Sequence, residues 1–415
     1  MGKADGPSAR AEWQQHWSLV VATAMGMSFA TVLTFSFGVM LGPLEAEFGW
    51  TRAEITTGPA IVSVIGFLLS APGGYLIDKF GSRRCGAFVV VTTTIAIALM
   101  SQVDTIWQWR AAWALFGMTA GFTSTVWLAP VSAIFNAGRG MAIAFTLAGV
   151  GLSMAIVPAI AEYFVENYSW RTGFLALAGI WFVLTMPLIL TLVPDRPSPA
   201  NSGTEDYLDK AEQAIGLTPR EGFTTPPLYL LFFASLLASM TGSALMVNAV
   251  PVLIDTGISR GQAVAIVGSM GVASIAGRLV GGVLMDHFDV RRLAICGVLM
   301  SLGLPLSLLL FPGEAWAAHA GVITYGLTGG MTMNAVVYLA TTHLGHRSFG
   351  LFYGVLSITT TLAGGVGPLL ANHVYDLTQS YLSVIWMTVP GFGGAALLFF
   401  LLGPAPDFAH PVANG

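Results

Sequence analysis

Residues 271–292 read GVASIAGRLVGGVLMDHFDVRR, and this stretch decides how the rest of the chain is interpreted. The segment is apolar except for Arg278, and it leads into a turn that carries two aspartates and two arginines. A charged side chain at the centre of a membrane-spanning helix costs at least about 2.5–3.5 kcal/mol. We therefore expect a polar group to meet the Arg278 guanidinium.

The composition indicates a membrane protein. Of the 415 residues, 55% are hydrophobic and 9% are charged, whereas a soluble domain carries roughly 25% charged residues. The net charge of -4 is small and spread along the chain, which argues against nucleic acid as a partner. The two cysteines, Cys85 and Cys296, have no obvious pairing and are interpreted as buried thiols.

Apolar runs of about 20 residues, the length that crosses a bilayer, recur along the whole sequence. Only helices and closed barrels satisfy backbone groups in lipid, and these runs are too long and too uniformly apolar for barrel strands. The predicted fold class is an all-α membrane protein with twelve transmembrane helices in two six-helix halves. The predicted spans are 17–41, 55–78, 84–103, 109–135, 139–162, 172–193, 227–253, 261–285, 292–311, 315–341, 349–371 and 380–402.

The longest polar interruption, residues 194–226, predicts the domain boundaries. It separates an N-terminal half at 1–193 from a C-terminal half at 227–415 and is predicted to be a cytoplasmic linker. Basic residues favour cytoplasmic loops. With the N-terminus inside, the loops expected in the cytoplasm hold Lys3, Arg10, Lys79, Arg83, Arg84, Arg139, Arg196, Lys210, Arg220, Arg291, Arg292 and Arg347, whereas the external loops hold Arg52, Arg110, Arg171 and Arg260. Both termini are therefore predicted to be cytoplasmic.

The two halves repeat each other. Residues 73–84, GGYLIDKFGSRR, match residues 281–292, GGVLMDHFDVRR, at an offset of 208. Residues 117–123, GMTAGFT, match residues 326–332, GLTGGMT, at an offset of 209. Two six-helix halves in parallel repeat are the layout of a large class of secondary transporters, with the substrate site near mid-membrane between the repeats.

The residues of this repeated turn resemble the hallmark motif of the major facilitator superfamily. That motif lies between the second and third helices, and it is matched by Gly74, Asp78, Lys79, Gly81, Arg83 and Arg84. In the second copy His287 replaces the basic residue and Asp289 replaces the glycine. A second common feature of the superfamily is matched by Ser169, Trp170, Arg171 and Phe174. The resemblance implies a transporter whose halves rock to expose the site to either side.

Within that superfamily the chain is most similar to the branch of monocarboxylate transporters and oxalate/formate antiporters. The branch carries an arginine in the eighth helix that binds a carboxylate, and residues 277–282, GRLVGG, have this form around Arg278. Animal monocarboxylate transporters also place an aspartate one turn earlier and a lysine in the first helix. Here the first position is Ser274 and the predicted first helix has no lysine, so the animal scheme of proton coupling does not transfer.

Arg278 is the principal candidate substrate ligand. It lies eight residues before Asp286, or roughly 12 Å from the turn at the rise of an α-helix. All acidic residues are predicted to lie in loops or at helix ends, so no embedded carboxylate is expected to pair with Arg278. A planar guanidinium suits a visiting carboxylate, to which it binds through two hydrogen bonds. The alternative is an arginine satisfied by carbonyls or by a neighbouring helix.

The other candidate ligands carry weaker arguments. Asn334 is predicted at a similar depth and either donates to the anion or bonds an adjacent helix. Thr123 and Asn248 are either ligands or polar contacts between helices. Phe35 and Phe145 either line an apolar part of the cavity or face the core or the lipid.

The charged turns are predicted to act as gates. Ion pairs at these helix ends are expected to hold the cytoplasmic side closed when the site faces outward, and the alternative is a solvated turn with cytoplasmic charges. The gating residues are Asp78, Arg83, Arg84, Asp286, Arg291 and Arg292.

The sequence thus predicts a secondary transporter of small organic anions, monocarboxylates first, that works as a monomer in a cell inner or plasma membrane. Coupling is expected by proton symport or by anion exchange. The sequence contains no nucleotide-binding loop and no cluster of metal ligands, so neither enzyme activity nor a cofactor or metal is predicted. The alternatives are a proton-coupled exporter of drugs or other small molecules and a transporter-like anion sensor.

Overall fold

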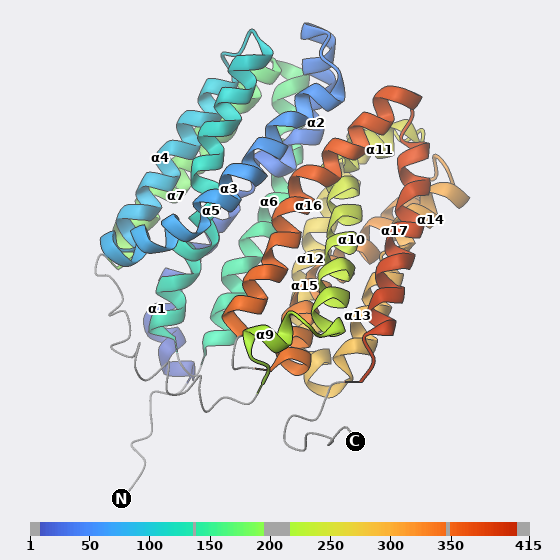
Figure 1. The fold of residues 1–415 in the computed structure, drawn as a ribbon. Helices are drawn as coiled ribbons and strands as arrows, with labels where there is room; N and C mark the ends of the chain where they lie inside the picture. The colour runs from blue at the N-terminus through green and yellow to red at the C-terminus, as the bar shows by residue number, and fades with distance from the viewer. Residues whose placement is uncertain (1–8, 136–137, 195–215, 346–348, 405–415) are drawn as a thin grey trace, which may run out of the picture. The chain divides into compact units, whose positions relative to one another are not determined.

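The computed structural model describes residues 9–135, 138–194, 216–345 and 349–404, and nearly all of them are helical (Figure 1). Within these ranges the only β pairing is an isolated bridge between Gly216 and Gly345. The helices are α1 (Ala9–Ala30), α2 (Val32–Phe48), α3 (Arg52–Phe80), α4 (Ser82–Met100), α5 (Ile106–Ile134), α6 (Arg139–Asn167), α7 (Trp170–Leu192), α9 (Pro219–Gly222), α10 (Pro226–Val247), α11 (Ala249–Asp255), α12 (Arg260–His287), α13 (Val290–Met300), α14 (Gly303–Leu310), α15 (Ala315–Leu344), α16 (Phe349–Thr378) and α17 (Leu382–Leu401).

These helices confirm the predicted all-α fold and account for twelve spans. Three predicted spans are each made of two consecutive helices: α1 with α2, α10 with α11, and α13 with α14. Eleven spans in the described residues are long and apolar enough to cross a membrane. The twelfth, α15, has 30 residues, or about 45 Å. It is less apolar because it carries several glycines and threonines and His319.

The chain forms two units, Met1–Ala200 and Asn201–Gly415. In the first unit α3 packs along α5, α1 along α6, and α4 between α5 and α7. In the second unit α12 packs along α15, α10 along α16 and α17, and α13 against α15 and α17. The predicted linker, 194–226, lies outside the described residues from 195 to 215. Its last part forms α9, whose Phe223 cap packs on Phe352 with ring centroids 6.2 Å apart.

The internal repeat reappears as a matched pair of buried hydrogen bonds. In the first unit the hydroxyl oxygens of Thr93 and Thr119 lie 3.4 Å apart, between α4 and α5. In the second unit the hydroxyls of Ser301 and Thr328 lie 2.8 Å apart at the start of the α13–α14 break and on α15. The offsets that relate these residues are the 208 and 209 found in the sequence. Equivalent helices therefore meet at equivalent depth in each half.

In the first unit, α1 and α6 approach closely enough to bond through small polar side chains. The Ser28 hydroxyl lies 2.6 Å from that of Ser153 and accepts the indole N–H of Trp181 at 2.9 Å. A Cβ atom added to Gly149 would lie 2.0 Å from the carbonyl oxygen of Ala24. Small residues permit such approaches between membrane helices, and hydroxyl pairs then strengthen the contact. This packing fixes α1 just before the helix breaks at Thr31.

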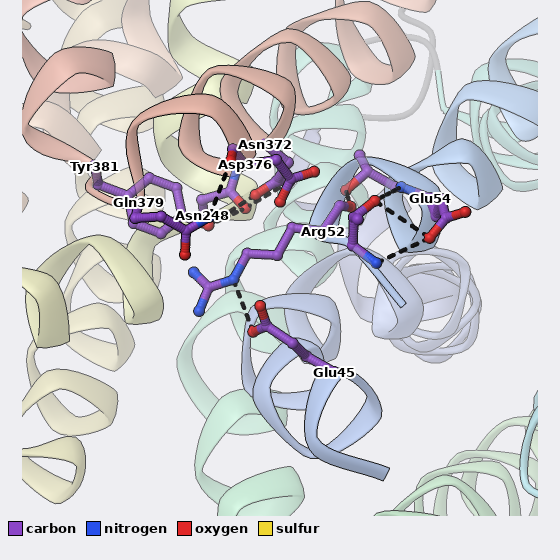
Figure 2. A network of polar contacts seen from close by, with 10 residues as sticks. Glu45, Arg52, Glu54, Asn248, Asn372, Asp376, Gln379 and Tyr381 are labelled. Atoms are coloured by element: carbon purple, nitrogen blue, oxygen red, sulfur yellow. Dashed lines mark hydrogen bonds and ion pairs between the residues drawn. The ribbon is translucent and has the colours of Figure 1, made fainter. Parts of the chain in front are cut away.

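Arg171 connects three elements at one end of the first unit. Its guanidinium pairs with Glu47 at the end of α2 and donates to Asp104 Oδ1 at 3.2 Å in the α4–α5 loop. Nearby, Arg52 at the start of α3 pairs with Glu45 of α2 at 3.1 Å (Figure 2).

Candidate functional site

The predicted site in the second unit is built on the contact between α12 and α15. The two helices run in parallel register, since Gly326 lies against Met270 and Gly330 lies against Ser274. Further along, a Cβ atom on Gly277 would lie 2.0 Å from the carbonyl oxygen of Leu327. Glycines on both helices therefore bring the two backbones into direct contact. This contact determines where Arg278 lies.

Arg278 is half-buried on α12, nine residues before the end of this helix at His287. Its Cγ atom lies beside Gly330 on α15, where an added Cβ atom would be 2.9 Å away. Among the residues whose side chains the structure describes, none forms a hydrogen bond or an ion pair with the guanidinium. The five N–H donors of this group are thus available to an anion.

Asn334 lies on α15, four residues beyond Gly330, which is the residue beside Arg278. It is therefore about one helical turn further along α15 than that contact. Its backbone is helical, but its side chain lies outside what the structure describes. Its predicted role as a second ligand remains a prediction.

Three other predicted ligands lie in the first unit. The Thr123 hydroxyl is buried and donates to the carbonyl oxygen of Thr119 on the same helix at 2.6 Å. Phe35 on α2 is 7% exposed, whereas Phe145 on α6 is 46% exposed and packs edge-on against Trp13 at 5.4 Å between centroids. Of the three, Phe145 presents the most surface, and Thr123 has the geometry of a helix-packing residue.

Asn248 belongs to a buried polar network in the second unit (Figure 2). It lies between α10 and α11, and its side chain donates to the carbonyl oxygen of Ala244 at 2.9 Å. Its side-chain oxygen accepts a hydrogen bond from the side-chain amide of Asn372 at 3.0 Å. The Tyr381 hydroxyl donates to the side-chain oxygen of Asn372 at 2.7 Å. Asn248 is fully buried and bonded at both ends of its amide. This geometry supports a structural role at the helix break.

The predicted gate residues are described only in part. The side chains of Asp78 and Asp286 lie outside what the structure describes, so their ion pairs remain predictions. Arg83 donates from Nε to the carbonyl oxygen of Val193 at 2.5 Å and thereby connects the start of α4 to the end of α7. Its counterpart Arg291 has a buried Nε with no hydrogen-bond partner in the described part of the chain. The remaining gate residues, Arg84 and Arg292, are exposed.

The sequence analysis missed one embedded acidic residue, Glu162. The predicted span ended at 162, but α6 continues to Asn167, so Glu162 lies within the helix and is 5% exposed. The prediction that every acidic residue lies in a loop or at a helix end is therefore wrong. Pro158 lies one turn earlier and does not end the helix.

His343 was also misplaced by the sequence. The predicted span ended at residue 341, but α15 extends to Leu344 and His343 is 2% exposed. Its Nδ1 lies 3.1 Å from the carbonyl oxygen of Leu339 and its Nε2 lies 3.5 Å from that of Gly403. Of the two cysteines predicted to be buried, Cys85 is buried and Cys296 is exposed. Among the described residues there is no group of three or more side chains suited to a metal ion.

Comparison with known proteins agrees with this architecture. The family model described as Major Facilitator Superfamily matches residues 20–368, with a further match at 231–414. Human monocarboxylate transporter 11 is 24% identical over 387 residues, which are 88% of this chain and 78% of that protein. The oxalate:formate antiporter of Oxalobacter formigenes is 21% identical over 367 residues, 86% of this chain and 85% of that protein.

A solved structure shares the fold. The crystal structure of a D-xylose-proton symporter matches with a TM-score of 0.74 and 16% sequence identity, over 94% of this chain and 99% of that one. The likeness at this identity concerns the fold alone. Because the family model covers most of the sequence and the described helices have the expected number and order, the chain belongs to the Major Facilitator Superfamily and is a multi-pass membrane transporter.

Proposed function

We propose that the protein is a secondary transporter of small monocarboxylates that works by alternating access. The observation that carries the proposal is Arg278, a guanidinium on a membrane-spanning helix with no protein acceptor among the described side chains. A charge in this setting is costly unless it is paired. A carboxylate supplies both the opposite charge and the two acceptor oxygens that match the guanidinium.

The resemblance to monocarboxylate transporters and to an oxalate:formate antiporter supports the same class of substrate. We propose one carboxylate rather than two, because the sequence offers no second arginine or lysine away from the ends of the predicted spans. The excess of basic residues in alternate loops supports an inner or plasma membrane location with both termini cytoplasmic.

The test is uptake of radiolabelled pyruvate into proteoliposomes that contain the purified protein. Arg278→Ala and Arg278→Lys should each lower uptake at least tenfold, since lysine keeps the charge but not the planar pair of donors. Arg220→Lys, an exposed arginine on α9, is the matched control and should transport normally. Normal pyruvate uptake by folded Arg278→Ala protein would refute the proposal.

The same vesicles distinguish proton symport from anion exchange. Symport predicts that an inward proton gradient accelerates uptake into empty vesicles, whereas exchange predicts that uptake requires unlabelled carboxylate inside. In the symport mode we assign the proton to Glu162, because a buried carboxyl group within a span can carry one. Glu162→Gln should then abolish acceleration by the gradient while it leaves exchange intact.

A proton-coupled exporter of other small molecules is the second candidate, and Glu162 is the observation that favours it. Under that reading Arg278 is structural, and uncharged compounds are the substrates. Proton release from vesicles upon addition of such compounds, lost in Glu162→Gln and retained in Arg278→Lys, would select the exporter. Binding of pyruvate without any flux would instead indicate a sensor.

A further inference from the structure

The turn of α12 that carries Arg278 packs closely against Gly330 of α15. A Cβ atom added to Gly330 would lie 2.6 Å from the carbonyl oxygen of Ser274 and 2.9 Å from the backbone nitrogen of Arg278. It would also lie 2.9 Å from the Cγ atom of Arg278. Two of these atoms are backbone atoms of a packed helix and cannot turn aside, so a larger residue must displace the turn or the side chain.

Ser274 and Arg278 are four residues apart, so in a regular helix the first carbonyl accepts the N–H of the second. Gly330 therefore touches both ends of the turn from which Arg278 projects, as well as the first part of its side chain. One methyl group added at residue 330 would therefore displace the backbone turn or the side chain that positions the guanidinium.

The first unit supplies an internal comparison. By the repeat, Gly66 and Gly121 correspond to Ser274 and Gly330, and Ser70 occupies the place of Arg278. There a Cβ atom on Gly66 would lie 3.4 Å from Ala120 Cβ and 3.5 Å from the Gly121 nitrogen, which is ordinary contact. The arginine thus belongs to the second half only, whereas the facing glycine is common to both halves.

We propose that Gly330 is a positioning residue for Arg278, and that its lack of a side chain fixes the guanidinium in the orientation that binds the carboxylate. The inference rests on the proposed function of Arg278 and adds the residue that sets its geometry. A two-point hydrogen bond requires alignment of both planes, and a displacement of about 1 Å at such a site can cost up to about 100-fold. We expect Gly330→Ala to weaken pyruvate affinity about tenfold.

Gly326→Ala is the matched control. It lies one turn earlier on the same face of α15, where a Cβ atom would be 2.6 Å from the Met270 carbonyl oxygen and 2.9 Å from Ala273 Cβ. It therefore strains the same helix pair without contact with Arg278. Pyruvate affinity should stay near that of the wild type in Gly326→Ala. In an Arg278→Ala background, Gly330→Ala should cause no further loss, because it acts through the arginine.

A second readout is independent of any carboxylate. The rate at which phenylglyoxal modifies Arg278, measured on the Arg278 peptide by mass spectrometry, should change in Gly330→Ala and not in Gly326→Ala. Equal losses in both glycine variants with unchanged modification of Arg278 would overturn the positioning role. Normal pyruvate binding by Arg278→Ala would overturn the proposed function instead, while the modification rates would still decide where the guanidinium lies.

Discussion

At the scale of single residues, buried polar side chains in the second unit form hydrogen bonds with one another. Asn248 and Asn372 form a bonded amide pair, and Tyr381 supplies the hydroxyl that completes it. A polar group in lipid-like surroundings is costly unless it is bonded. The helix break after Val247 is therefore held by side chains from α16 and from the start of α17.

Removal of the Tyr381 hydroxyl should weaken this network. In Tyr381→Phe the Asn372 oxygen loses its donor at 2.7 Å, and loss of such a buried hydrogen bond costs about 1–3 kcal/mol. We expect a lower thermal unfolding temperature in detergent. Tyr163→Phe, at a side chain that is 56% exposed, is the control and should unfold like the wild type. Equal unfolding temperatures for both variants would contradict the role of the network.

At the scale of helices, the sequence predicted the number of spans and most of their ends to within a few residues. It did not predict the breaks at Thr31 and Asn248, because an apolar run reads the same whether one helix or two cross the bilayer. It also could not predict helix rotation. Lipid outside and protein inside are both apolar, so Phe35 and Phe145 looked equivalent in sequence, although one is buried and the other exposed.

Close packing between α1 and α6 makes a prediction at this scale. In Gly149→Ala the new methyl group would meet the backbone of Ala24, with the Cβ atom 2.0 Å from its carbonyl oxygen. Overpacking of this kind costs about 1–3 kcal/mol. We expect a lower unfolding temperature and less monodisperse protein on gel filtration.

The control for this variant is Gly179→Ala on α7 of the same unit, where an added Cβ atom meets nothing within 4 Å. There alanine should be neutral or stabilising by up to about 1 kcal/mol, because it favours a helix over glycine. The prediction is wrong if both substitutions change stability in the same direction.

At the scale of the whole molecule, the repeat explains both what the sequence could predict and what it could not. The common offset of 208 to 209 predicted that equivalent helices recur, and the hydroxyl pairs of the two units agree with it. The proposed substrate ligand is a departure from the repeat, since Arg278 in the second half stands where the first half has Ser70. Which protein groups surround that arginine depends on side-chain packing, which a pattern of apolar residues does not encode.

The gate hypothesis is a property of the whole transport cycle, and Cys85 offers a built-in reporter for it. Cys85 is buried at the start of α4, close to the first charged turn, with its Sγ atom 3.5 Å from the carbonyl oxygen of Leu76. In a Cys296→Ser background it is the single cysteine left in the sequence. Opening of the predicted cytoplasmic side should expose this thiol to a membrane-impermeant maleimide.

Asp78→Asn removes the charge with which the first turn is predicted to hold that side closed. A shift of about 1.4 kcal/mol in the balance of states changes the open population about tenfold while that population is small. We therefore expect Cys85 to react faster with the maleimide in Asp78→Asn, with pyruvate affinity little changed because Asp78 is not a predicted ligand. Glu314→Gln, an exposed carboxylate before α15, should leave the rate as it is in the wild type. Since a turn that is merely solvated would not alter access to a buried thiol, an unchanged rate in Asp78→Asn would reject the gate.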